Sequence, residues 1–190
     1  QTGSGPVFAV AAASFSHNVV HVLELFNTPT GSYTYDVRNT FKVEGCPASL
    51  DWHSDSLLVG QNNGKMSQFS SSTGVCGTNK LIYPRPSTSW ELGADNVVAC
   101  AFLKSKEPVV VALPAGRTHF KFVELKDVGC TEVSLNHDST IVAMATSPNG
   151  KYLATGTVAG SIFLWVKEEG MRFVQSGKSQ VLHSDAISSL

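Results

Sequence analysis

The chain has 190 residues, of which 42% are hydrophobic and only 15% are charged, and its 14 basic and 15 acidic side chains nearly cancel. Balanced charge without a run of Lys or Arg lacks the electrostatic footprint of a nucleic-acid binder, so we expect no direct sequence-specific contact with nucleic acid. No apolar stretch reaches the roughly 18 residues that a membrane-spanning helix needs, and the first residues lack the basic and apolar regions of a secretion signal. We therefore expect no membrane span.

The four cysteines, Cys46, Cys76, Cys100 and Cys130, include no Cys-x-x-Cys pair. Structural zinc sites usually take ligands from such pairs, so we expect no metal. No glycine-rich segment has the spacing that holds a phosphate, so we expect no cofactor. Cysteines without a disulfide framework are typical of reducing compartments, which favours an intracellular location, cytoplasmic or nuclear.

Strands are predicted from short apolar or alternating runs that end at turn residues. In chain order, the first group has strands at 7–13, 18–26 and 33–41. The second group has strands at 48–52, 57–60 and 65–69, with the hairpin turn Asn62-Asn63-Gly64 between the last two. The third group has strands at 97–102 and 108–113, and then a strand in which Thr118, Phe120 and Phe122 alternate with other residues.

A long loop is predicted between the second and third groups, at 83–95. Arg85 lies there between two prolines, and Trp90 stands among polar residues. Arg and aromatic side chains on loops are typical interface anchors, so both are candidate contacts with a partner. The alternative for Trp90 is that it packs against its own fold.

The clearest unit begins at His137 and has predicted strands at 141–145, 151–157, 161–166 and 171–174. The turn at 147–150 has the sequence Ser-Pro-Asn-Gly, in which Pro and Gly supply the special backbone angles. When the opening strands of the groups are aligned on this unit, Trp52, Phe102 and Thr146 share one column at spacings of 50 and 44 residues. Four short strands joined by tight turns form a meander, which is the unit of one propeller blade.

At residues 137–165 the segment HDSTIVAMATSPNGKYLATGTVAGSIFLW resembles a WD repeat, with its early His, its Ser-Pro-Asn-Gly turn and its Trp at the end of the third strand. The resemblance implies a structural polar network formed by His137, by Thr155 or Thr157, and by Trp165. The Asp of the family's turn is missing, since Val158 and Ala159 stand there, so we expect the network to be incomplete or water-filled. His183 would start the same network in the next repeat.

The resemblance predicts an all-β chain, a β-propeller of WD-repeat type. The blades are expected at 6–44 (partial), 45–90, 91–136 and 137–180, with 181–190 as the first strand of another. Because propellers close with about four to eight blades, we expect a partial propeller of about four blades from a larger ring of about seven. The absence of an initial Met agrees with a fragment. The alternative is that 187–190 complete the first blade and close a four-blade ring.

Residues 51–55 (Asp-Trp-His-Ser-Asp) contain the residue types of a catalytic triad. Alternate residues of a strand share a face, so Asp51 and His53 point together, and the segment is more simply a strand that runs into a turn. We predict no catalytic residue, no enzyme activity and no small-molecule substrate.

The function expected from the resemblance is a non-catalytic protein–protein interaction scaffold within a multi-subunit eukaryotic complex. The segment VVACAFLKSKEPVVVALPAGRTHFKF, with its Leu113-Pro114 ending of a strand, is similar in layout to the replication-fork adaptor family that links helicase to polymerase alpha, so a replisome adaptor is one alternative. A chromatin-reader propeller, or a propeller enzyme whose site lies in other blades, is another.

Overall fold

The computed structural model describes residues 9–14, 17–28, 30–53, 56–70, 72–73, 81–82, 86–93, 96–103, 109–114, 116–124, 130–135, 137–168, 172–177 and 180–190. Within these ranges all regular secondary structure is β-strand, arranged in antiparallel sheets, so the all-β prediction is confirmed. The propeller itself is not established by this observation.

Four larger sheets follow one another along the chain. The first sheet contains β1 (Ala9–Ser14), β2 (His17–Asn27) and β3 (Tyr33–Lys42) in that order. The second contains β4 (Pro47–His53), β5 (Ser56–Gln61), β6 (Lys65–Ser70) and β9 (Thr88–Glu91). The third contains β10 (Val97–Leu103), β11 (Val109–Pro114), β12 (His119–Glu124) and β13 (Cys130–Ser134).

The fourth sheet contains β14 (Ile141–Thr146), β15 (Tyr152–Thr157), β16 (Ser161–Lys167) and β17 (Phe173–Gln175), and β18 (Gln180–Val181) also pairs with β16. A small separate ladder joins β7 (Ser72–Thr73) to β8 (Leu81–Ile82). We call β4, β10 and β14 the leading strands, because each opens its sheet.

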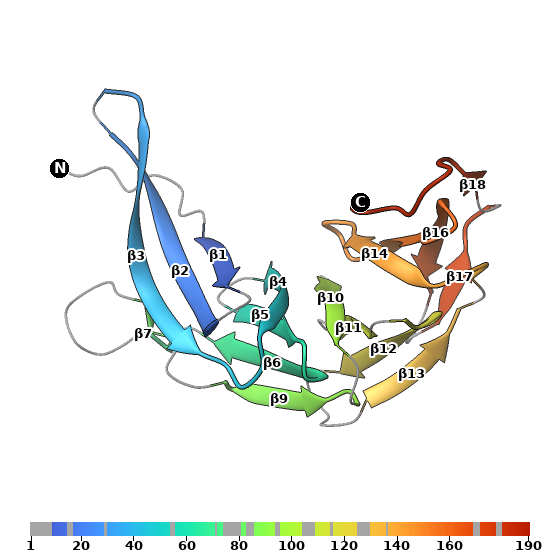
Figure 1. Cartoon of the computed structure of the whole chain (residues 1–190), viewed down its shortest axis with the longest axis horizontal. Coiled ribbons are helices and arrows are strands. Elements are labelled where there is room, and N and C mark those ends of the chain that lie inside the picture. Colours follow the sequence, from blue (N-terminus) through green and yellow to red (C-terminus); the bar gives the residue numbers. More distant parts are fainter. Residues whose placement is uncertain are drawn as a thin grey trace.

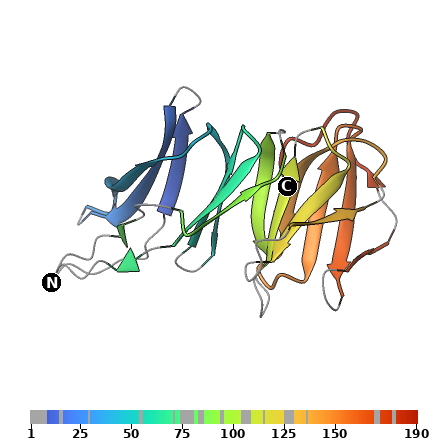
Figure 2. The ribbon, with the colours of Figure 1, turned by 90° about the horizontal axis from the view of Figure 1, so that it is seen from below.

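The sheets stand side by side in chain order and form an open arc (Figure 1), and the view from below shows the same succession (Figure 2). The first and fourth sheets are the two ends of the arc, and they do not meet. The structure therefore does not show the closed four-blade ring that was the alternative, because the chain end lies beside the fourth sheet and not beside β1.

Three apolar cores hold the arc together, and each lies between two neighbouring sheets. Burial of one large apolar side chain contributes about 1.5–3 kcal/mol, so these cores are the main stabilising contacts between sheets. The core between the first and second sheets contains Val20, Val22, Phe41, Leu57, Val59 and Phe69. The next contains Leu58, Met66, Trp90, Leu92, Val97, Cys100, Phe102 and Ala112. The last contains Leu103, Val111, Leu113, Leu135, Ile141, Leu153, Phe163, Trp165 and Phe173.

The second, third and fourth sheets share one register. Each has an irregularity after the first residue of its leading strand, between Pro47 and Ser49, between Val97 and Ala99, and between Ile141 and Ala143. Five positions further along each leading strand stand Trp52, Phe102 and Thr146, each paired with the second residue of the next strand. The predicted column of these three residues is confirmed.

The hairpin turns form where glycine permits a positive φ. Gly64 has φ 78° and Gly160 has φ 79°, a region that other residues adopt only with strain. The amide of Gly64 donates to the carbonyl of Gln61, the last residue of β5, and the amide of Gly160 donates to the carbonyl of Thr157, the last residue of β15. The predicted hairpin at Asn63-Gly64 is confirmed.

Two predictions about elements were wrong. The loop expected at 83–95 contains β9, which pairs with β6 and completes the second sheet. The strand expected to open after His183 is not assigned, although residues 182–190 are described and Ile187 is buried.

Candidate functional site

A buried polar chain runs through the fourth sheet. The hydroxyl of Thr155, on β15, lies 2.8 Å from Nε2 of His137 and 3.0 Å from Nε1 of Trp165 on β16. The other ring nitrogen of His137, Nδ1, lies 3.1 Å from the carbonyl oxygen of Leu135. One tautomer satisfies all three contacts: Nδ1–H donates to the carbonyl, Nε2 accepts from the hydroxyl, and the hydroxyl oxygen accepts from the indole.

Burial disfavours the protonated form of this imidazole. Burial lowers the pKa of His137, while hydrogen bonds to the backbone of Leu135 and Thr118 and the charge of Asp138 act in the opposite direction. The ring also packs against Phe163 and Trp165, with centroids 4.8 and 5.0 Å away. Both ring nitrogens of His137 are thus engaged in contacts within the fold.

The turn residues Val158 and Ala159 supply no carboxylate, and the carbonyl of Leu135 is instead the partner of Nδ1 of His137. A carboxylate is nevertheless close by, since Asp138 accepts from the hydroxyl of Ser161. A backbone oxygen leaves no side-chain signal in the sequence, which is why the substitution could not be predicted.

The other two predicted members lie outside this chain of bonds. Thr157 is fully buried, and its hydroxyl oxygen accepts a hydrogen bond from the amide of Ser161 at 3.3 Å. Thr157 therefore belongs to the turn before β16. His183 has an exposed side chain, and its amide lies 3.4 Å from the carbonyl of Gly160. Of the five predicted residues, the structure brings together His137, Thr155 and Trp165.

The second sheet holds apolar residues at the equivalent positions. Thr155 pairs with Met144 and Trp165 with Leu153, and the shared register places Val59 and Phe69 in the same two positions. Val43 precedes its leading strand by the same interval as His137 and packs against the same core. Equivalent positions of the two sheets therefore hold a hydrogen-bonded polar set in the fourth sheet and an apolar set in the second sheet.

The two candidate interface residues have different outcomes. Arg85 lies outside the described residues. Trp90 is only 3% exposed and packs into the core between the second and third sheets, so its expected role as an exposed anchor was wrong and the alternative, packing against its own fold, holds. The reason is the alternation of β9, which turns Trp90 inward beside Met66 while Ser89 and Glu91 are exposed.

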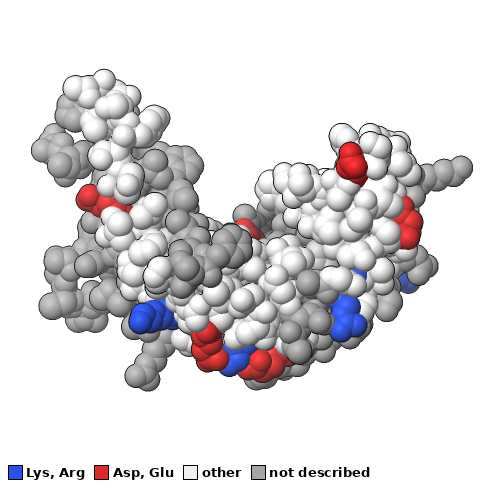
Figure 3. All heavy atoms as spheres, in the orientation of Figure 1, with Lys and Arg blue, Asp and Glu red and all other residues white. Residues whose placement is uncertain are grey.

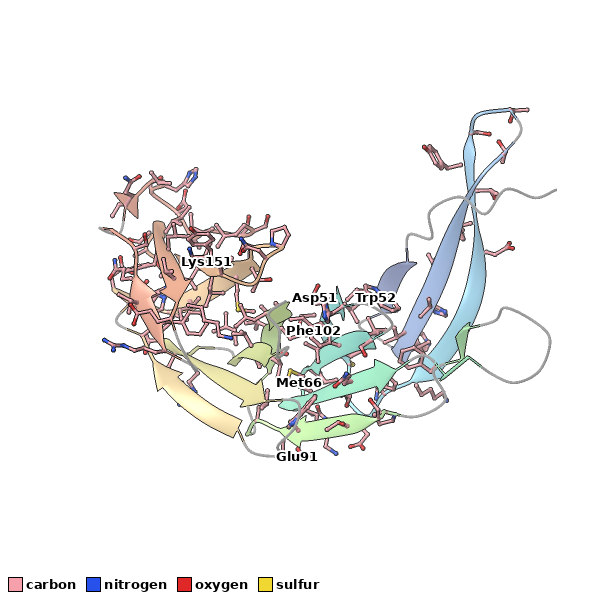
Figure 4. All side chains as sticks on the ribbon, turned by 180° about the vertical axis from the view of Figure 1, so that it is seen from behind. Asp51, Trp52, Met66, Glu91, Phe102 and Lys151 are labelled. Carbon is pink, nitrogen blue, oxygen red and sulfur yellow. The ribbon has the colours of Figure 1, made fainter. Side chains whose placement is uncertain are left out.

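The Asp-Trp-His segment serves strand packing. The carboxylate of Asp51 accepts the amide of Phe102 at 2.7 Å, which links the leading strands β4 and β10. Figure 4 shows Asp51 and Trp52 beside Phe102 on the inner side of the arc. The ring of His53 packs on Phe102, with centroids 5.6 Å apart. Ser54 and Asp55 lie outside the described residues.

A second polar chain, missed from the sequence, crosses the second sheet from the buried Gln61 and Ser67 to the exposed Ser89. The side chain of Gln61 accepts the amide of Gly45 at 2.8 Å and donates to Ser67 at 3.1 Å, and Ser67 lies 3.0 Å from the hydroxyl of Ser89. None of these partners is a base that would activate a serine. The chain therefore serves hydrogen-bond satisfaction between strands.

One pocket adjoins this chain, between the first and second sheets. Its volume is about 270 Å³, and its lining residues are Lys42, Val43, Glu44, Ser67, Phe69 and Pro86. Ligand pockets usually measure about 300–1,000 Å³. The pocket lies just below the lower end of this range.

Exposed apolar side chains lie on the hairpin of β2 and β3, which projects from the first sheet (Figure 1). Tyr33, Tyr35 and Val37 are 74, 63 and 54% exposed, and their spacing of two residues places them on one face of the strand. Figure 3 shows acidic and basic side chains interspersed along the convex side of the arc. Val181 and Leu182, at the other end of the chain, are 72 and 55% exposed.

Two further features, a metal-ligand cluster and a membrane-spanning helix, are absent from the described part of the chain. No three His, Cys, Asp or Glu side chains of the described residues come together in a way that could hold a metal ion. Over the same ranges, no helix has the length and hydropathy that crossing a bilayer requires. No protein-family model matches the chain, and no curated protein matches it.

Proposed function

We propose that the chain is a segment of a WD-repeat β-propeller and acts as a non-catalytic scaffold for protein–protein interaction. The observation that carries the proposal is the repetition of one register in three successive antiparallel sheets, one of which holds the His137–Thr155–Trp165 chain. Antiparallel meanders that pack in succession are the building blocks of propellers.

The chemistry of the described residues favours binding over catalysis. The side chains of His137 and Thr155 are hydrogen-bonded to each other. Ser67 is hydrogen-bonded to Gln61 and to Ser89 within the second sheet. The feature turned outward is instead the face of Tyr33, Tyr35 and Val37. Tyr is enriched in protein interfaces and dominates binding energy there, so this face is the proposed contact with another protein of a multi-subunit assembly.

The thiols support a reducing compartment, and we place the protein in the cytoplasm or nucleus. Cys46 and Cys100 are free cysteines of the described chain. Burial raises the pKa of Cys100 to about 12, so this thiol behaves as a small apolar group of the core.

The binding proposal is tested on the hairpin. Partners that co-purify in stoichiometric amounts are identified, expressed in pure form and titrated against the chain by calorimetry. The triple variant Tyr33→Ser, Tyr35→Ser and Val37→Ser should weaken binding at least tenfold. A matched control replaces exposed apolar residues of the fourth sheet, Val158→Ser and Leu164→Ser, and should bind normally. Equal binding by both variants would reject the hairpin as the contact.

The propeller proposal has its own test. An experimental structure should show β4, β10 and β14 as the innermost strands of sheets that radiate from one axis. Sheets that stack in a straight row without a common axis would contradict it.

A further inference from the structure

The outer edge of β3 is open along the projecting part of the hairpin. β3 stands last in the order of its sheet, and β2 is the strand to which it pairs among the described residues. Every residue from Gly31 to Val37 is exposed, so no described part of the chain covers this stretch. Figure 1 shows the hairpin extending beyond the end of β1.

The register shows which backbone groups face this open edge. At the turn, the amide of Thr28 donates to the carbonyl of Ser32 at 2.7 Å, so these two residues form a hydrogen-bonded pair. Hydrogen-bonded and non-hydrogen-bonded pairs alternate along antiparallel strands. Counted along the ladder from the turn, Tyr33, Tyr35 and Val37 occupy the non-hydrogen-bonded positions. Their N–H and C=O groups therefore point away from β2 and toward the open edge.

The side chains along the edge differ between its two faces. The residues with outward backbone groups, Tyr33, Tyr35 and Val37, also form the exposed apolar row on one face. On the other face, Asp36 is exposed and has neither a hydrogen bond nor an ion pair with the described residues. Glu24 of β2 stands directly opposite Asp36 in the register, and like charges at opposed positions destabilise a sheet. A basic residue at this level of an added strand would offset that repulsion.

This part of β3 lacks the usual protection of an edge strand. Proteins commonly protect such edges with Lys, Pro or a bulge. Residues 33–37 contain neither Lys nor Pro, and the bulge of this ladder comes only after Val37, at the step between Val22 and Leu23. The regular stretch is long enough for one added strand, since strands average about 5–6 residues.

We propose that the edge at residues 33–37 binds an extended segment of a partner protein, added antiparallel to β3, with a basic residue opposite Asp36 and apolar residues on either side of it. This inference rests on the proposed function, since it states how the partner binds this face and by which chemistry. The apolar residues would form hydrogen-bonded pairs with β3. The basic residue would stand in a non-hydrogen-bonded pair, where side chains are closest. In this mode of recognition the main chain gives affinity and alternate side chains give specificity.

A partner strand suits this edge better than a second copy of the chain. Residues 31–37 contain Asp36 and no basic residue. A second copy that paired through the same edge would therefore bring further negative charge and no opposite charge. Asp36 thus disfavours self-association and at the same time favours a basic partner.

Synthetic peptides test the strand pairing. The probe is a capped, fluorescent peptide of sequence Thr-Val-Lys-Val-Thr-Val-Thr, whose Lys would stand opposite Asp36 and whose central Val would stand opposite Tyr35. N-methylation of the central Val removes an amide that faces β3, and binding measured by fluorescence anisotropy should weaken about tenfold. The matched control is N-methylation of the Thr that follows, whose amide faces away from β3. This change should leave the dissociation constant within about twofold.

Charge reversal tests the choice of partner. A peptide with Glu in place of the Lys should bind the native chain about fivefold more weakly, because Glu would face Asp36. Asp36→Lys should reverse this preference and favour the Glu peptide. The control variant, Asp185→Lys, changes an exposed acidic residue near the other end of the chain and should keep the native preference. Circular dichroism checks that both variants are folded.

The outcomes separate the alternatives. Equal weakening by both N-methyl peptides, or the absence of saturable binding up to about 1 mM unmodified peptide, would overturn strand addition. Dimers of the chain that the peptide dissociates would assign the edge to a second copy instead. The serine variant of the hairpin, measured against the natural partner, reports on the proposed function. If that variant weakens partner binding while the N-methyl peptides do not differ, the hairpin is the contact and strand addition is wrong. If the N-methyl peptides differ while partner binding is unchanged, the edge binds strands and the proposed function fails.

Discussion

Replacing Thr155 with Val removes one hydroxyl that serves two partners. The side chain of Thr155 is fully buried and Trp165 is 3% exposed, so the indole N–H would lose its acceptor at 3.0 Å without gaining water. A buried group left in this state costs about 1–3 kcal/mol, and the half-buried His137, which water can partly reach, adds about 1 kcal/mol. We therefore expect the free energy of unfolding to fall by about 2–4 kcal/mol, although the volume of the side chain is conserved.

The decisive comparison is with a fully apolar replacement. The triple variant His137→Val, Thr155→Val and Trp165→Phe reproduces the set that the second sheet carries at these positions. Urea unfolding followed by circular dichroism gives each free energy, and an unchanged slope confirms the same transition. The cost of the triple variant should be smaller than the sum of the three single costs by about 1–3 kcal/mol. Costs that add within about 0.5 kcal/mol would show that the three side chains do not form one network.

Three further predictions concern single positions. Because burial lowers the pKa of His137, the unfolded chain binds a proton at this residue at higher pH than the folded chain does. The free energy of unfolding should therefore be highest above the ordinary pKa of 6.5 and should decrease as the pH falls from there toward the lowered native pKa. Urea titrations at several pH values should show that His137→Gln loses this dependence. Gly60→Ala should lower the free energy of unfolding by about 1–3 kcal/mol, because the new methyl group would crowd Ser49 Oγ of the same sheet and Cγ1 of Val97, 2.8 Å away in the third sheet. An unchanged denaturation midpoint would argue against this close packing around Gly60. Burial raises the pKa of Cys100 to about 12, so this thiol should stay unreactive toward a thiol reagent at pH 8 until the chain unfolds. The half-buried Cys46 should react before Cys100 does. Modification of Cys100 in the native chain would refute its burial.

Local chemistry made part of the fold predictable. The strands β14, β15 and β16 lie within one residue of their predicted bounds, because the turns between them are set by nearby Pro and Gly residues. The strands β9 and β13 were not predicted. Trp90 is buried because β9 pairs with β6, more than twenty residues earlier, and such a pairing leaves no mark on a short polar segment.

The polar chain of the fourth sheet was predictable only in part, for a related reason. Its side chains stand at the spacing of a WD repeat, so three of its members could be named from the sequence. The remaining acceptor is the carbonyl of Leu135, a group that every residue carries, and only the folded path of the backbone brings it to His137. A sequence pattern reports which side chains are available and does not report which backbone atoms replace a missing one.

What repeats along this chain is geometry more than chemistry. The irregularity in each leading strand and the close approach at Gly60 and Gly156 recur in different sheets, while the residues around them change character. Polar groups are tolerated there when their bonds are complete, as at Thr155, and apolar groups when they replace the whole set. Trp90 lies between these two cases. Its buried Nε1 has no hydrogen-bond partner among the described residues, while its ring contributes a large apolar contact. Each sheet therefore has to pair its own buried polar groups. Neighbouring sheets are held together by the apolar cores between them and by the hydrogen bonds of the Phe102 backbone with Asp51 and with Thr146.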